Sequence, residues 1–116
     1  MSERDPALPL RHMRDAARRA IAIAAPLARE QLEADQVETL ALTRLVEIVG
    51  EAARRVPDAV RKEHAEIPWR QIAGTRDRLI HGYDQVDLDI LWNIVVDQLP
   101  KLVARLDEAL KGTEQS

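Results

Sequence analysis

The segment Arg76-Asp-Arg-Leu-Ile-His81-Gly-Tyr83 holds the side chains best suited to chemistry in this chain of 116 residues. A guanidinium such as that of Arg76 binds phosphate or carboxylate oxygens through paired donors, and the imidazole of His81 exchanges protons near neutral pH. Together they favour acid–base chemistry at a bound anion. A histidine near a helix C-terminus also interacts favourably with the helix dipole, so the pattern alone leaves a structural role for His81 open.

Periodicity places Arg76 in an apolar seam. A helix is predicted from Pro68 to about Ile80 or His81, and one face of it carries Trp69, Ile72, Ala73, Arg76, Leu79 and Ile80. A cation in such a seam needs a partner, a water-filled cleft or an anion. His81 lies roughly 140° around that helix from Arg76. The two side chains are therefore expected to meet on one phosphate only if the helix end is distorted or if two chains contribute.

Other chemical signatures are weak in this sequence. Without cysteine there is no thiolate metal site and no thiol nucleophile. The four glycines do not form a phosphate-binding loop. Asp84, Asp87 and Asp89 come nearest to a metal cluster, but carboxylates at the start of a helix also complement its dipole, and we favour that role. We predict no metal and no cofactor.

The elements that must position this segment are predicted to be all α-helical. Alanine, leucine, arginine and glutamate dominate the sequence, and no segment alternates with period two as a strand would. Asp35 and Asp87 are predicted N-caps, and Pro100 is expected to kink the last helix or to leave one carbonyl unpaired. The predicted helices span residues 8–25, 35–56, 57–64, 68–81 and 88–110. Residues 1–111 form one predicted domain, and 112–116 a frayed tail.

Charge and composition exclude several classes of function for this chain. The net charge is −3 and aromatic residues make up 3% of the chain, which excludes a broad basic surface or a platform for stacking bases. Residues 1–29 carry six arginines against three acidic residues. This basic segment could bind a polyanion or an acidic partner, but we favour a face that is simply solvated. The apolar run at 20–28 is too short for a membrane span and atypical of a signal peptide, so a cytoplasmic protein without membrane contact is expected.

Three stretches carry a resemblance to a known family. They are residues 45–55, residues 67–83 with Pro-Trp-Arg at 68–70, and residues 86–92 leading to Asp97-Gln-Leu-Pro100. Over residues 45–106 the chain resembles the HepT-like toxins of the HEPN superfamily, whose motif of Arg, four residues, His, one residue and Tyr is matched by Arg76, His81 and Tyr83. The resemblance implies an up-and-down, HEPN-like bundle of four to five helices that forms a symmetric dimer, with the motifs of both chains lining a shared cleft.

The resemblance also implies an activity. In a type VII toxin–antitoxin system such a toxin is a metal-independent RNA endonuclease, in which Arg76 would bind the scissile phosphate and His81 would act as acid or base at the ribose 2′-hydroxyl. Asp77, a supporting polar residue, stands where these toxins usually have Asn. A minimal nucleotidyltransferase antitoxin would neutralise the toxin by attaching AMP to Tyr83. The implied partners are RNA, this antitoxin and a second copy of the chain, alone or within a larger hetero-oligomer.

Two other functions compete with this one, and one residue has an open role. The chain could be a non-catalytic nucleotide- or partner-binding subunit of a nucleotidyltransferase complex, or a purely structural helical dimer. Glu51 follows Gly50 and precedes two alanines, which permit close helix approach, and Arg54 or Arg55 is an available partner. We interpret Glu51 as a structural or interfacial residue.

Overall fold

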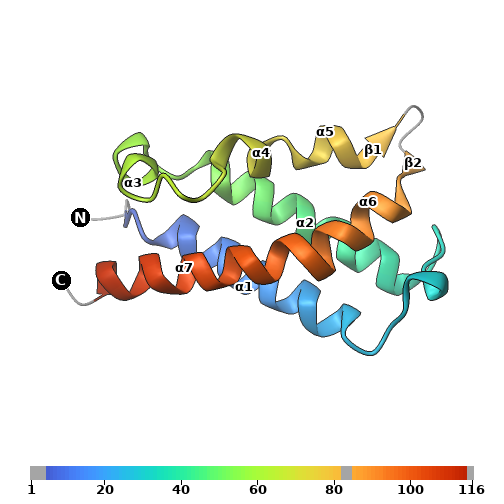
Figure 1. Ribbon diagram of the computed structural model, residues 1–116. Helices are drawn as coiled ribbons and strands as arrows, with labels where there is room; N and C mark the ends of the chain where they lie inside the picture. The colour runs from blue at the N-terminus through green and yellow to red at the C-terminus, as the bar shows by residue number, and fades with distance from the viewer. Residues whose placement is uncertain (1–4, 82–84, 115–116) are drawn as a thin grey trace.

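Three long helices form the body of the molecule: α1 (Leu8–Ala24), α2 (Val37–Arg54) and α7 (Leu99–Glu114). The structure is a computed structural model that describes residues 5–81 and 85–114. α1 packs against both α2 and α7, and the three run alongside one another (Figure 1). The predicted all-α, HEPN-like bundle is confirmed.

Small side chains allow α1 to approach its neighbours. Its buried face consists largely of alanine, namely Ala16, Ala17, Ala20 and Ala24, beside Leu10 and Met13. Before α1, the Asp5 carboxylate accepts hydrogen bonds from the Ala7 amide at 2.9 Å and from Arg11 Nη2 at 2.6 Å. The Arg11 hydrogen bond, followed by that of the Ala7 amide, holds the pKa of Asp5 below its ordinary value. The first helix therefore begins where the sequence predicts, and the Asp5 side chain holds the residues just before it in place.

α2 begins later than predicted. A 3₁₀ turn, η1 (Arg29–Gln31), precedes it, and the residue before its first turn is Gln36 rather than Asp35. The Gln36 side chain accepts a hydrogen bond from the Glu33 amide at 3.2 Å, so it closes the preceding turn instead of capping the helix. Asp35 was thus wrong as a cap, because this local turn delays the start of α2.

The predicted helix over 68–81 is broken in two. α3 (Asp58–Glu63) is followed by α4 (Trp69–Ala73) and α5 (Thr75–Leu79). Gly74 lies between them at φ −90° and ψ 7°, a turn conformation that interrupts the α-helical ladder. The Thr75 hydroxyl donates to the Gln71 carbonyl at 3.1 Å across this break. The helical phase therefore changes at Gly74, which alters the side-chain pattern expected for α5.

A short hairpin follows α5, although no strand was expected. β1 (Ile80–His81) pairs antiparallel with β2 (Gln85–Val86), with Ile80 opposite Val86 and His81 opposite Gln85. Leu79 is fully buried, and its carbonyl accepts a hydrogen bond from the Asp87 amide at 2.8 Å. Strands of two residues are too short for a period-two pattern to be recognised, which explains why the sequence failed to predict them.

The last helical stretch changes form before its proline. α6 (Leu88–Asn93) leads into a π-helical turn, η2 (Ile94–Gln98), and then into α7. Pro100 has no amide hydrogen, and the wider turn just before it accommodates the gap in the ladder. α7 continues through Gly112 to Glu114 where a frayed tail was predicted, because the buried Ala109 and Leu110 hold its last turns against the core. None of the described helices is long and apolar enough to cross a membrane.

Candidate functional site

Arg76 extends from α5 into solvent rather than into an apolar seam. Its side chain is 67% exposed, and its Nε lies 3.6 Å from Glu47 Oε2 on α2. Thr75 takes the buried position instead, because the break at Gly74 resets the helical phase. Beside Arg76 is a small hollow of about 40 Å³ whose wall includes Glu47 and Ala73. The placement of Arg76 in the apolar seam was therefore wrong, although apolar seam members such as Ile72 and Leu79 do pack in or against the core. The requirement that Arg76 have a partner is met by Glu47.

The remaining motif residues lie at the end of α5 and beyond it. Asp77 is exposed, and its amide donates to the Gly74 carbonyl at 3.1 Å. The His81 backbone is in β1, and its side chain is outside the described part of the structure. Tyr83 falls in 82–84, which lies outside the described residues altogether. The structure therefore fixes Arg76 and the backbone of His81 within the motif.

The helix end between Arg76 and His81 has the distortion that a shared phosphate would require. α5 ends at Leu79, and Ile80 is extended at φ −106° and ψ 125°. The 140° separation expected on a continuous helix therefore does not apply to His81, because the backbone has left the helix before that residue.

Glu51 has a different partner from the two that the sequence offered. Its Oε2 lies 3.3 Å from Nη1 of Arg44, which is seven residues earlier on α2. Arg54 instead donates from Nη2 to the Ala73 carbonyl at 2.8 Å. The close approach expected at Gly50 is present, since a Cβ there would lie 3.2 Å from the Ile72 carbonyl oxygen. This region therefore joins α2 tightly to α4.

The aspartates considered as metal ligands have structural roles where they are described. Asp87 caps α6, with its Oδ1 accepting from the Ile90 amide at 3.0 Å, and Asp89 pairs with Arg29 Nε at 2.6 Å. Asp84 lies outside the described residues. Within residues 5–81 and 85–114, no group of histidine and acidic side chains is arranged to hold a metal ion.

Several arginines of the basic N-terminal segment are already paired. Arg18 Nη2 lies 2.9 Å from Asp107 Oδ1 on α7, and Arg14 Nη1 lies 3.9 Å from the same oxygen. Arg11 pairs with Asp5. Part of the positive charge of residues 1–29 is therefore neutralised by carboxylates within the chain.

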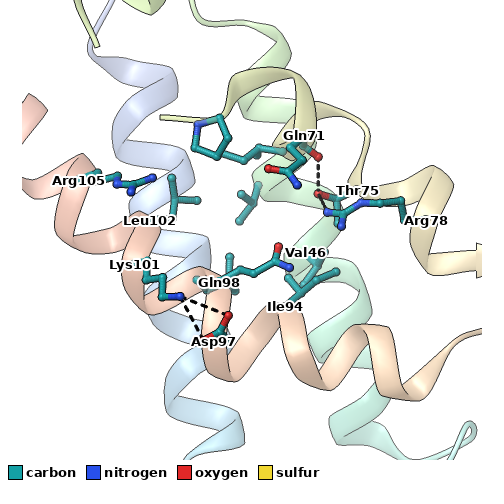
Figure 2. Close-up of a pocket in the computed structure, with 14 residues that line it drawn as sticks. Val46, Gln71, Thr75, Arg78, Ile94, Asp97, Gln98, Lys101, Leu102 and Arg105 are labelled. Atoms are coloured by element: carbon teal, nitrogen blue, oxygen red, sulfur yellow. Dashed lines mark hydrogen bonds and ion pairs between the residues drawn. The ribbon is translucent and has the colours of Figure 1, made fainter. Parts of the chain in front are cut away.

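No sequence pattern predicted the larger cavity that lies between α4–α5 and η2–α7, with Val46 and Val49 of α2 in its lining. Its volume is about 230 Å³. Figure 2 shows Gln71 and Gln98 extending into it from opposite walls, with the Arg78 guanidinium beside them. Its lining comes from segments near residues 46–49, 68–78 and 94–105. No local motif links these three segments, so only the fold brings them together.

Comparison with known proteins identifies similar chains. A family model described as "Ribonuclease HepT-like" matches residues 7–109. "Putative RNase TTE0752" of Caldanaerobacter subterraneus is 39% identical over 82 residues, which cover 71% of this chain and 73% of that protein. "Probable ribonuclease HepT" of Thermococcus cleftensis is 38% identical over 82 residues, or 71% of this chain and 74% of that protein. No solved structure matches the chain significantly.

Proposed function

Because this chain belongs to the HepT-like ribonuclease family, we propose that it is the RNA-cleaving toxin of a type VII toxin–antitoxin system. The observation that carries the proposal is the position of the Arg76 and His81 motif within the matched residues, on a helix end that opens into a hairpin. The exposed Arg76 guanidinium is free on much of its surface to bind an RNA phosphate.

The proposed reaction is metal-independent cleavage by the 2′-hydroxyl of RNA. His81 removes the proton of this hydroxyl, or donates a proton to the leaving 5′-oxygen, as an imidazole can near neutral pH. The 2′-oxygen bonds to phosphorus while the bond to the 5′-oxygen breaks, which leaves a 2′,3′-cyclic phosphate and a 5′-hydroxyl. Arg76 stabilises the charge that develops on the phosphate oxygens. DNA lacks the 2′-hydroxyl and is not a substrate.

We place this chemistry at the cleft of a symmetric homodimer, where two copies of Arg76 and His81 face one RNA. A dimer doubles the local positive charge at the cleft without making the rest of this acidic chain basic. Asp77, exposed beside Arg76, acts as a supporting polar residue. If the protein is a monomer under conditions in which it cleaves RNA, this part of the proposal is wrong.

Neutralisation is proposed to occur at Tyr83. The tyrosine hydroxyl of the toxin attacks the α-phosphorus of ATP bound to a minimal nucleotidyltransferase antitoxin, and pyrophosphate leaves. The attached AMP places a phosphate two residues from His81 in sequence, where it competes with RNA for the arginine. Co-expression with the transferase should add one or more AMP masses, and Tyr83→Phe should abolish the addition. AMP on another residue would contradict the assignment.

Expression of the chain alone tests the activity itself. We expect growth arrest and loss of RNA with the wild type, and normal growth with His81→Ala at equal protein level. Purified protein should cleave RNA in the presence of EDTA and leave cyclic phosphate ends. Intact RNA with a folded wild-type protein would overturn the ribonuclease proposal and favour a non-catalytic binding subunit.

A further inference from the structure

The cavity between α4–α5 and η2–α7 has an apolar floor and a polar rim. The floor is formed by aliphatic side chains from three segments: Val46, Val49, Ile72, Ile94, Leu99 and Leu102. With a volume of about 230 Å³, it is far larger than the space taken by one water or one inorganic ion. Such a cavity suits an organic group with an apolar body, oriented by the polar groups around it.

Arg78 supplies a cation at this cavity. Its Nε is buried and has no hydrogen-bond partner in the described part of the chain, and its Nη2 lies 3.5 Å from Thr75 Oγ1, at the limit of a hydrogen bond. Among the described residues, no carboxylate forms an ion pair with Arg78. A buried guanidinium nitrogen without a partner is costly, and an anion bound in the cavity would satisfy it.

The other charges around the cavity leave it net positive. Lys101 Nζ lies 3.4 Å from Asp97 Oδ1, so these two charges largely compensate each other. Arg105 donates from Nη1 to the Glu66 carbonyl at 3.1 Å, and it forms no ion pair with a carboxylate among the described residues. Arg78 and Arg105 therefore give the cavity an excess of positive charge.

Two amides face each other across the gap. The side chains of Gln71 and Gln98 enter from α4 and from the π-turn η2 (Figure 2). No hydrogen bond within the described residues engages either side-chain amide. Each presents a donor and an acceptor, the pairing that the polar edge of a nucleobase requires.

We propose that this cavity binds one nucleotide unit, with its phosphate at Arg78, its base on the apolar floor and the base edge between Gln71 and Gln98. The choice of a nucleotide rests on the proposed ribonuclease function. Arg76 lies beside Glu47 of α2 and is not part of the cavity lining, whereas Arg78 lines the cavity. The cavity is therefore separate from the cleavage site, and the unit it holds is either part of an RNA strand or a free nucleotide.

The experiment follows side-chain NMR signals of the ¹⁵N-labelled full chain. Adenosine or uridine 5′-monophosphate should shift the Arg78 Nε–H signal and the Gln98 amide signals. Arg78→Gln should weaken nucleotide binding at least tenfold, and Gln98→Leu, which keeps the side-chain size, should weaken it severalfold. Arg70→Gln, at an exposed arginine of α4 outside the cavity, is the matched control and should bind as the wild type does.

Several outcomes would overturn the cavity proposal. They are the absence of nucleotide-induced shifts, equal shifts with inorganic phosphate alone, and shifts that follow protein concentration, which would mean that a second copy fills the cavity. A short RNA added to the His81→Ala variant distinguishes the two nucleotide sources: shifts with RNA support a strand subsite, and shifts only with mononucleotide support a free ligand. RNA cleavage by the wild type is measured separately, so cleavage without nucleotide shifts refutes only the cavity, and shifts without cleavage refute only the ribonuclease.

Discussion

Arg76 and Glu47 form an ion pair across the junction of α5 and α2, with Arg76 Nε 3.6 Å from Glu47 Oε2. Glu47 is shared, because its Oε1 lies 3.6 Å from Arg44 Nη1, which also contacts Glu51. The guanidinium proposed to bind RNA therefore already has a carboxylate partner in the free protein. A phosphate that binds there has to share Arg76 with Glu47 or displace it.

Glu47→Gln should strengthen RNA binding. The substitution removes the competitor for Arg76 and also a negative charge beside the expected phosphate. The pair is partly exposed, and ion pairs near the surface are worth about 0.2–1 kcal/mol, so we expect KM to fall about two- to threefold with a smaller change in kcat. Steady-state cleavage of a short RNA measures both constants, and the effect should shrink as salt concentration rises.

Glu38→Gln is the matched control for this substitution. It removes the same charge from an exposed position in the first turn of α2, away from Arg76. KM should then remain close to the wild-type value. If Glu47→Gln raises KM, or lowers kcat more strongly than KM, the carboxylate orients Arg76 and the competition argument is wrong.

Arg76→Ala should abolish most activity and leave the fold intact. Loss of a group that stabilises developing charge costs about 100-fold or more in kcat/KM. The side chain is 67% exposed. The free energy of unfolding should therefore change by no more than about 0.5 kcal/mol in a urea titration. Arg76→Lys keeps the charge but lacks the planar guanidinium, so its kcat/KM should lie between those of the wild type and Arg76→Ala.

Arg70→Ala serves as the comparison for Arg76→Ala. It removes an exposed arginine from α4, just before the same break in the chain. Wild-type cleavage by Arg70→Ala would show that general positive charge is not what matters. Wild-type cleavage by Arg76→Ala would remove Arg76 from the mechanism.

The sequence predicted the fold well because long-range packing and local propensity agree over most of it. α1 ends one residue before the predicted limit, α3 lies within its predicted range, and Asp87 caps α6 as expected. The break at Gly74 was missed, since one glycine in an otherwise periodic helix is often tolerated. We attribute the break at Gly74 to the packing of α4 against α2, which no local pattern reveals.

The site was predicted less completely, for a physical reason that Arg76 illustrates. Its residue type and spacing were recognised, but its direction depends on the helical phase, which Gly74 resets. Glu47 lies 29 positions earlier in the chain, so no local pattern could identify it as the partner of Arg76. The Arg78 cavity was missed for the same reason.

Gly50→Val should destabilise the protein. A Cβ at Gly50 would lie 3.2 Å from the Ile72 carbonyl oxygen and 3.8 Å from that of Ala73, and a branched side chain adds more atoms against this backbone. Overpacking of this kind costs about 1–3 kcal/mol. Thermal or urea unfolding followed by circular dichroism measures the loss.

Gly112→Ala provides the opposite case within the same protein. Gly112 lies in α7, and nothing among the described residues comes within 4 Å of a Cβ built there. Alanine should raise the free energy of unfolding by up to about 1 kcal/mol, because it favours the helix. If both substitutions destabilise the protein equally, the close approach at Gly50 is not the reason that Gly50→Val lowers the free energy of unfolding.

Asp87 offers a test of capping against metal binding. Its Oδ1 accepts from the Ile90 amide at 3.0 Å, and its own amide donates to the Leu79 carbonyl at 2.8 Å, so it links α6 to the hairpin that carries His81. Asp87→Ala should lower the free energy of unfolding by about 1 kcal/mol and Asp87→Asn by much less, because asparagine caps a helix as well as aspartate does. RNA cleavage should fall with Asp87→Ala, since a loosened α6 no longer fixes the hairpin.

EDTA should not change the melting temperature of the wild type. A melting temperature that drops with EDTA, together with an Asn variant as unstable as the Ala variant, would instead identify Asp87 as a metal ligand.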